Sequence, residues 1–123
     1  MSKVILVVDD DQQIRTLVRR ILRPSGYTII EATDGEQGVK LAKARKPDLI
    51  LMDILMPGMD GYAACHILKT DSVTRQIPMV MLTAVNTELS KDATEHIGAD
   101  GYVTKPFTRE RLLDAISQFL PTS

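Results

Sequence analysis

The stretch MSKVILVVDDDQQIR, residues 1–15, decides the fold, because an apolar run, Val4–Val8, leads directly into three aspartates and then into a helical pattern. The run does not alternate apolar with polar residues, which is typical of a strand buried on both faces of a parallel sheet. Neighbouring carboxylates repel one another unless a cation joins them or some are protonated. A buried strand that delivers Asp9, Asp10 and Asp11 to one place therefore predicts a site at its carboxyl end.

Four more apolar runs follow, rich in the residue types of buried strands: Tyr27–Ala32, Leu49–Met52, Met79–Leu82 and Tyr102–Val103. Segments of helical periodicity separate these runs. The clearest apolar stripes belong to the first and last helices: Ile14, Leu17, Val18, Ile21 and Leu22, then Leu112, Leu113, Ile116, Phe119 and Leu120. Weaker helices are predicted over Glu36–Ala44, Tyr62–Lys69 and Thr87–Ile97.

Turn and capping residues agree with this division. Pro24-Ser25-Gly26 ends the first helix and Pro47 closes the second. Carboxylates and hydroxyls also stand where helix N-caps are needed, at Asp34 (with Gln37 as its capping partner), Asp60 and Thr108. Asp11 is expected to begin the first helix, where a carboxylate favours the positive N-terminal end of the helix dipole. The element order is therefore a strand followed by a helix, repeated five times.

That order predicts an α/β fold, a doubly wound parallel sheet with right-handed crossovers and helices on both faces. The length of 123 residues suits one domain, expected to cover residues 1–123, because the chain ends just after the fifth helix. No linker or low-complexity tract interrupts it.

Composition narrows the function. The formal net charge is −1, from 15 basic and 16 acidic residues, which argues against direct binding of nucleic acid. The sequence has neither a membrane span nor a signal peptide, and Cys65 has no second cysteine to pair with, so a cytoplasmic protein is expected. We interpret Cys65 as a small apolar helix residue, and His66 and His96 as surface residues of helices.

Ligands of open α/β sheets bind outside the carboxyl ends of the strands. Asp9 and Asp10 follow the first strand, Asp53 the third, Thr83 the fourth and Lys105 the fifth. Oxygen ligands from carboxylates suit Mg²⁺, which keeps open positions for a phosphate oxygen. Lys105 and Thr83 could bind further phosphoryl oxygens, and one carboxylate could act as a nucleophile. Taken singly, each aspartate also fits a helix N-cap, and Asp48, at the opposite edge, is assigned only to a turn.

In these residues the sequence resembles the receiver domain of bacterial two-component response regulators, the fold of the chemotaxis regulator. The resemblance covers essentially the whole chain. It is carried by Asp9-Asp10, by the pattern D-x-x-M-P-x-M-D-G from Asp53 to Gly61, by Thr83-Ala84, by G-A-D-G-Y from Gly98 to Tyr102, and by Lys105-Pro106-Phe107. The resemblance implies a flavodoxin-like (βα)5 fold with a five-stranded parallel sheet in the order 2-1-3-4-5.

The resemblance also implies roles for single residues. Asp53 is expected to be the phosphoacceptor, with Asp10 as a direct Mg²⁺ ligand and Asp9 supporting the metal through water. Leu55 is expected to offer its backbone carbonyl to the metal. Thr83 and Lys105 are expected to bind phosphoryl oxygens, and the Lys105–Pro106 peptide is expected to be cis. Thr83 and the aromatic Tyr102 form the expected switch, although Tyr102 also fits a half-buried strand position.

The implied partners are a sensor histidine kinase or a histidine phosphotransfer protein, and a downstream protein target. The target is expected to bind the surface formed by Thr87–Ile97, the last strand and the last helix. Such a protein is a signalling switch rather than an enzyme, although it assists its own Mg²⁺-dependent phosphorylation and dephosphorylation.

Three alternatives remain at this point. A dehalogenase-type phosphatase also has a nucleophilic aspartate after a parallel strand, but its motif has Thr or Val at the position of Gln13. A flavodoxin-like cofactor binder needs a polar phosphate loop instead of three aspartates. A degenerate receiver that acts as a phosphorylation-independent interaction module is the third.

Overall fold

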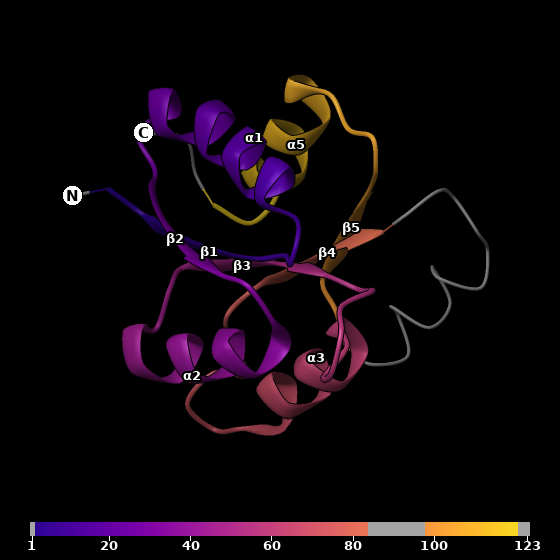
Figure 1. Ribbon diagram of the computed structural model, residues 1–123. Helices are drawn as coiled ribbons and strands as arrows, with labels where there is room; N and C mark the ends of the chain where they lie inside the picture. Colours follow the sequence, from indigo (N-terminus) through magenta and orange to yellow (C-terminus); the bar gives the residue numbers. More distant parts are fainter. Residues whose placement is uncertain (1, 84–97, 121–123) are drawn as a thin grey trace.

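The computed structural model describes residues 2–83 and 98–120, and in these ranges a five-stranded parallel sheet lies between two helical layers (Figure 1). The strands are β1 (Val4–Val8), β2 (Thr28–Ala32), β3 (Leu49–Asp53), β4 (Met79–Thr83) and β5 (Gly101–Thr104). Their order in the sheet is β2-β1-β3-β4-β5. The predicted doubly wound fold and strand order are confirmed.

Helices cover both faces of the sheet (Figure 1). The helices α1 (Gln12–Leu22) and α5 (Arg109–Ser117) lie above it in the figure, and α2 (Gly35–Arg45) and α3 (Gly61–Thr70) lie below it. Successive side chains of a strand point to opposite faces, so Ile5 and Val7 of β1 belong to one buried cluster and Leu6 and Val8 to the other. This double burial explains why the strands read as continuous apolar runs.

The predicted helix caps are present. The side chains of Asp34, Asp60 and Thr108 each accept a hydrogen bond from a backbone N–H in the first turn of the helix that follows. Asp11, expected to begin the first helix, also caps it through its side chain. A short 3₁₀ helix, Arg23–Ser25, follows α1 and ends at Gly26, whose φ of 96° lies in the left-handed region that favours glycine. Local chemistry therefore sets where these helices begin and where the 3₁₀ helix after α1 ends.

Some details differ from the predictions. The helix α5 ends at Ser117, so Phe119 and Leu120 follow the helix instead of continuing it, although Leu120 remains buried. The periodicity predicts Leu17 on the apolar stripe of the first helix, but Leu17 is 39% exposed, and the buried residues of α1 are Val18, Ile21 and Leu22. Cys65 is buried and His66 is exposed on α3, as predicted.

The predicted helix over Thr87–Ile97 lies outside the described residues, and so do Ala84 and His96. Within the described ranges, no helix combines the length and the hydropathy that crossing a bilayer requires.

Backbone hydrogen bonds continue past the strand ends and align the residues that follow. The N–H of Asp9 donates to the carbonyl of Ala32 at 3.1 Å, and the N–H of Ile54 donates to that of Leu82 at 3.2 Å. The N–H of Lys105 donates to the carbonyl of Thr83 at 2.6 Å. These bonds bring the residues after β1, β3 and β5 to one edge of the sheet.

Asp48 does more at the opposite edge than form a turn. Its carboxylate accepts a hydrogen bond from the N–H of Val4 at 2.7 Å, and its own N–H donates to the carbonyl of Val4 at 2.7 Å. The residue before β3 is thereby fastened to the start of β1, the strand that carries Asp9 and Asp10.

Candidate functional site

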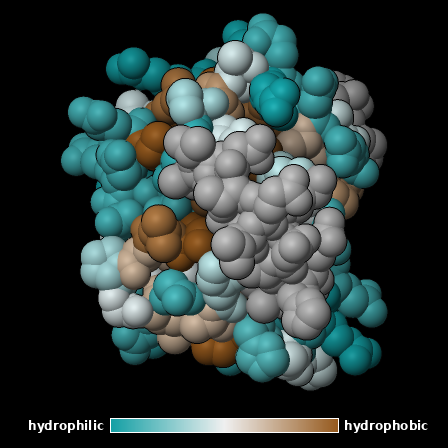
Figure 2. All heavy atoms as spheres, turned by 90° about the vertical axis from the view of Figure 1, so that its right-hand side faces the viewer, coloured by the Kyte–Doolittle hydropathy of each residue, from teal (hydrophilic) through white to brown (hydrophobic). Residues whose placement is uncertain are grey.

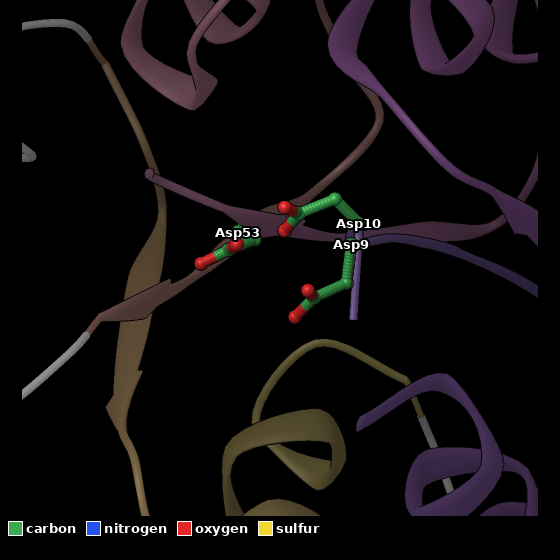
Figure 3. Close-up of side chains that lie close together, drawn as sticks. All are labelled: Asp9, Asp10 and Asp53. Carbon is green, nitrogen blue, oxygen red and sulfur yellow. The ribbon is translucent and has the colours of Figure 1, made fainter. Parts of the chain in front are cut away.

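Three carboxylates meet at the carboxyl edge of the sheet (Figure 3). Asp9 and Asp10 follow β1, Asp53 is the last residue of β3, and one oxygen of each lies within 4.8 Å of the others. Asp9 is fully buried and Asp53 is 5% exposed, whereas Asp10 lies at the surface. The site is therefore a concentrated negative charge with one side open to solvent.

Lys105 is the cation that faces this charge. Its ammonium Nζ donates to Asp9 Oδ2 at 2.8 Å and to Asp53 Oδ1 at 3.1 Å. Burial alone lowers the pKa of Lys105, but the hydrogen bonds and charges of Asp9 and Asp53 outweigh it and raise that pKa above its ordinary value. Lys105 precedes a cis peptide bond to Pro106, as expected.

The pKa of the Asp53 carboxyl group is raised in the folded protein. Burial raises its pKa from 3.8 to about 6; the charges of Asp9 and Asp10 act in the same direction, and Lys105 opposes them. One ammonium therefore does not compensate the three carboxylates, and a further cation at this place would be stabilising.

The raised pKa predicts how the fold responds to pH and to Asp53→Asn. Between pH 3.8 and about pH 6 the folded protein binds more protons at Asp53 than the unfolded chain does, so the free energy of unfolding falls as pH rises through this window. The side-chain amide of Asn does not ionise, so the free energy of unfolding of Asp53→Asn does not fall for this reason as pH rises. Without divalent cations, Asp53→Asn is therefore expected to be more stable than the wild type by about 1–3 kcal/mol above the window.

Urea denaturation on both sides of the window, in a chelating buffer, measures this difference. The stability advantage of Asp53→Asn should vanish below pH 3.8, where the unfolded wild type is also protonated at this position. Saturating Mg²⁺ should narrow the gap by stabilising the wild type. If the variant proved less stable than the wild type at about pH 8, the ion pair with Lys105 would outweigh the burial of Asp53.

Asp11, the third aspartate of the opening run, does not belong to the cluster. Its carboxylate accepts a hydrogen bond from the N–H of Gln13 at 2.8 Å and caps α1. Its N–H donates to Asp9 Oδ1 at 2.9 Å, so it also supports the site from outside. The three consecutive aspartates thus divide into two site residues and one helix cap.

The other residues implied by the resemblance lie on β4, on β5 and in the segment after β3. Thr83 is buried at the end of β4, and Leu55, two residues after Asp53, is 70% exposed. Tyr102 lies on β5, is 37% exposed, and lines a groove of about 300 Å³ together with α5 residues such as Arg111 and Asp114. Figure 2 shows the molecule from the right-hand side of Figure 1, and on this face small groups of hydrophobic side chains (brown) lie among hydrophilic ones (teal).

Sequence reasoning missed two residues that contact the site or support it. Arg15 donates from its guanidinium to the backbone carbonyl of Asp9 at 2.7 Å, and Glu31 pairs with Arg15 at 3.2 Å. No pattern in a single sequence indicates a contact between an arginine and a backbone carbonyl six residues earlier.

The donor set fits a hard divalent cation. Within the described residues, this cluster offers carboxylate oxygens and neither histidine nitrogen nor cysteine sulfur. Oxygen-only ligands with an open side are typical of Mg²⁺, whereas zinc prefers nitrogen and sulfur. The three carboxylates therefore form an acidic site of the kind that holds Mg²⁺.

Comparison with known proteins agrees with this geometry. A family model described as "Response regulator receiver domain" matches residues 5–117. The chain is 44% identical over 108 residues to the alkaline phosphatase synthesis transcriptional regulatory protein PhoP of Bacillus subtilis, a match that covers 88% of this chain and 44% of PhoP. The chain spans about half the length of the curated transcriptional regulators it matches.

Solved structures are similar over the whole fold. The chemotaxis protein CheY4 of Vibrio cholerae superposes with a TM-score of 0.92 at 31% identity, over 98% of this chain and 100% of that one. The receiver domain of the sensor histidine kinase PA1611 from Pseudomonas aeruginosa superposes with a TM-score of 0.89 at 30% identity, over 97% and 98% of the two chains. That structure contains a magnesium ion coordinated in the active site cleft.

The family match spans most of the sequence, and the sheet order and the acidic edge are those that the resemblance implied. The chain belongs to the response regulator receiver domain family.

Proposed function

We propose that this receiver is the phosphoacceptor of a two-component system or phosphorelay, and that Asp53 takes a phosphoryl group from a phosphohistidine. The observation that carries the proposal is the position of Asp53, which lies beside two other carboxylates and within 3.1 Å of the Lys105 ammonium. Such surroundings combine a nucleophilic oxygen with charges that can neutralise a phosphoryl group.

The proposed reaction forms a bond between a carboxylate oxygen of Asp53 and phosphorus, while the bond between phosphorus and the donor histidine nitrogen breaks. The electron pair of that bond stays on the imidazole. Lys105 donates to Asp9 and Asp53 in this structure, and we propose that it donates to a phosphoryl oxygen instead during the transfer. The Thr83 hydroxyl is proposed to donate to another, so positioning and charge neutralisation supply most of the catalysis.

Asp10 is the proposed direct Mg²⁺ ligand, together with Asp53 and the backbone carbonyl of Leu55. Asp9 is proposed to support the metal through water, because its two carboxylate oxygens already accept hydrogen bonds from Asp11 and Lys105. Asp10 is the surface-exposed member of the cluster, so its carboxylate is accessible to a metal ion that enters from solvent. Mg²⁺, when bound, supplies positive charge to the transferring phosphoryl group.

The proposed donor is a sensor histidine kinase or a histidine phosphotransfer protein, and the proposed readout is a protein target without direct contact to nucleic acid. Thr83 and Tyr102 are the proposed switch, with β5, α5 and the segment Thr87–Ile97 as the target surface.

We further propose a single receiver domain, residues 1–123, that works in the cytoplasm, where ATP-dependent kinases supply phosphohistidine. Its role is that of a switch that assists its own phosphorylation and dephosphorylation.

Incubation with Mg²⁺ and acetyl phosphate, followed by intact mass spectrometry, tests the proposal. The wild type should gain one phosphoryl group, and this gain should disappear in Asp53→Asn and in a chelating buffer. Asp60→Asn is a matched control, because Asp60 is an exposed N-cap of α3 and Asn is an equally good cap. No adduct from acetyl phosphate or from a cognate kinase would instead favour the phosphorylation-independent interaction module.

A further inference from the structure

The guanidinium group of Arg15 connects three parts of the fold next to the acidic site. Its NH1 donates to the backbone carbonyl of Asp9 at 2.7 Å, and its Nε donates to Glu31 Oε1 at 3.2 Å. Arg15 lies on α1, Asp9 follows β1, and Glu31 belongs to β2. The side chain of Arg15 is 13% exposed, so these hydrogen bonds are only partly open to competition from water.

Glu31 is itself held in place from a second side. Its other oxygen, Oε2, accepts a hydrogen bond from Arg19 NH1 at 2.6 Å. Arg15 and Arg19 therefore share one carboxylate from neighbouring turns of α1. Of these two arginines, Arg15 also donates to the backbone carbonyl of Asp9, and Arg19 contacts Glu31.

The position of Arg15 runs against the preference of its helix. It lies about one turn from the N-terminus of α1, where the helix dipole disfavours a positive side chain. The positive charge of Arg15 is unfavourable at this end of the helix, yet its guanidinium group bonds both Glu31 and Asp9. We therefore assign Arg15 to these contacts rather than to the stability of α1.

The carbonyl that Arg15 holds belongs to the peptide bond between Asp9 and Asp10. That peptide unit is planar, so fixing the carbonyl oxygen of Asp9 also fixes the direction of the Asp10 N–H and the position of its Cα. Asp9 is already held through its N–H and both carboxylate oxygens, by Ala32, Asp11 and Lys105. Within the described residues, the contact from Arg15 is the one that acts directly on the peptide leading into Asp10.

We propose that Arg15, oriented by Glu31, is a positioning residue that sets the peptide between Asp9 and Asp10 and thereby aims the Asp10 carboxylate toward Asp53. This inference rests on the proposed function, in which Asp10 binds Mg²⁺. Arg15 itself does not touch the metal or the phosphoryl group. Groups that orient metal ligands in this way commonly change metal affinity by about 10- to 100-fold.

Arg15→Met and Arg19→Met form a matched pair, because each removes one guanidinium and one contact to Glu31 and keeps an unbranched side chain on the helix. We expect Arg15→Met to weaken Mg²⁺ binding by about tenfold, measured by calorimetric titration, and Arg19→Met to stay within about twofold of the wild type. Arg15→Lys provides a second variant with the charge retained. It should also weaken binding, because an ammonium does not reproduce the fork that holds Asp9 and Glu31 together.

A metal-free measurement separates this inference from the proposed function. In a chelating buffer, the amide resonance of Asp10 should shift in Arg15→Met and stay in place in Arg19→Met. An unshifted Asp10 amide in Arg15→Met, or equal Mg²⁺ affinities in the two variants, would overturn the inference. If the wild type itself binds no Mg²⁺, the proposed function fails, and the amide comparison still decides the role of Arg15.

Discussion

Asp10→Asn is expected to lower the affinity for Mg²⁺ by about 100-fold or more, whereas Asp11→Asn should leave it within about twofold. Asp10 is the exposed member of the carboxylate cluster, and removing its charge removes both a ligand oxygen and a nearby attraction for the cation. Asp11 points its carboxylate at the N–H of Gln13 instead, and Asn serves that capping role as well as Asp does. Phosphorylation by acetyl phosphate should fall with the Mg²⁺ affinity.

Calorimetric titration with Mg²⁺ checks this ranking, with unfolding measurements to show that each variant is folded. Asp9→Asn should be intermediate, with a loss of about tenfold, because Asp9 is proposed to act through water. An affinity loss for Asp11→Asn as large as that for Asp10→Asn would contradict the division of the three aspartates.

Gly61→Ala is expected to lower the free energy of unfolding by about 3 kcal/mol or more, and to impair phosphorylation as well. A Cβ at Gly61 would lie 2.1 Å from the carbonyl oxygen of Asp53 and 2.7 Å from the Cα of Ile54. Both neighbours are backbone atoms, so α3 or the end of β3 must move. Such a movement would displace Asp53, the proposed phosphoacceptor.

Gly58→Ala is the matched control, because Gly58 lies in the loop between β3 and α3, three residues before Gly61. Its φ of 76° disfavours a side chain, but a Cβ there would meet no atom within 4 Å. The cost should therefore be that of the backbone conformation alone, about 1 kcal/mol. Chemical denaturation measures both variants, and equal losses would show that contact with Asp53 is not what requires glycine at position 61.

The fold could be predicted because its strands are buried on both faces. Val4–Val8 and Met79–Leu82 read as continuous apolar runs, and capping residues such as Asp34 and Asp60 mark where helices begin. Boundaries were less predictable: β2 begins at Thr28 instead of Tyr27, and α5 ends at Ser117, since hydrogen bonds to neighbouring strands and packing determine such ends.

The sequence predicted those site residues whose positions follow from the ends of the strands. Asp9, Asp10, Asp53 and Lys105 meet because parallel strands bring their carboxyl ends to one edge. The contact of Arg15 with a backbone carbonyl depends on side-chain geometry across β1, β2 and α1. The same is true of the hydrogen bond between Asp48 and Val4, since no local pattern indicates which backbone group a carboxylate reaches.

The central claim is that Asp53 carries the phosphoryl group, and chemical trapping tests it most directly. Borohydride reduces an acyl phosphate of aspartate to homoserine, so the phosphorylated residue can be identified by peptide mass spectrometry after treatment with acetyl phosphate and Mg²⁺. We predict homoserine at position 53 and unmodified aspartate at positions 9, 10 and 60. Homoserine at one of those other positions, or at none, would contradict the claim.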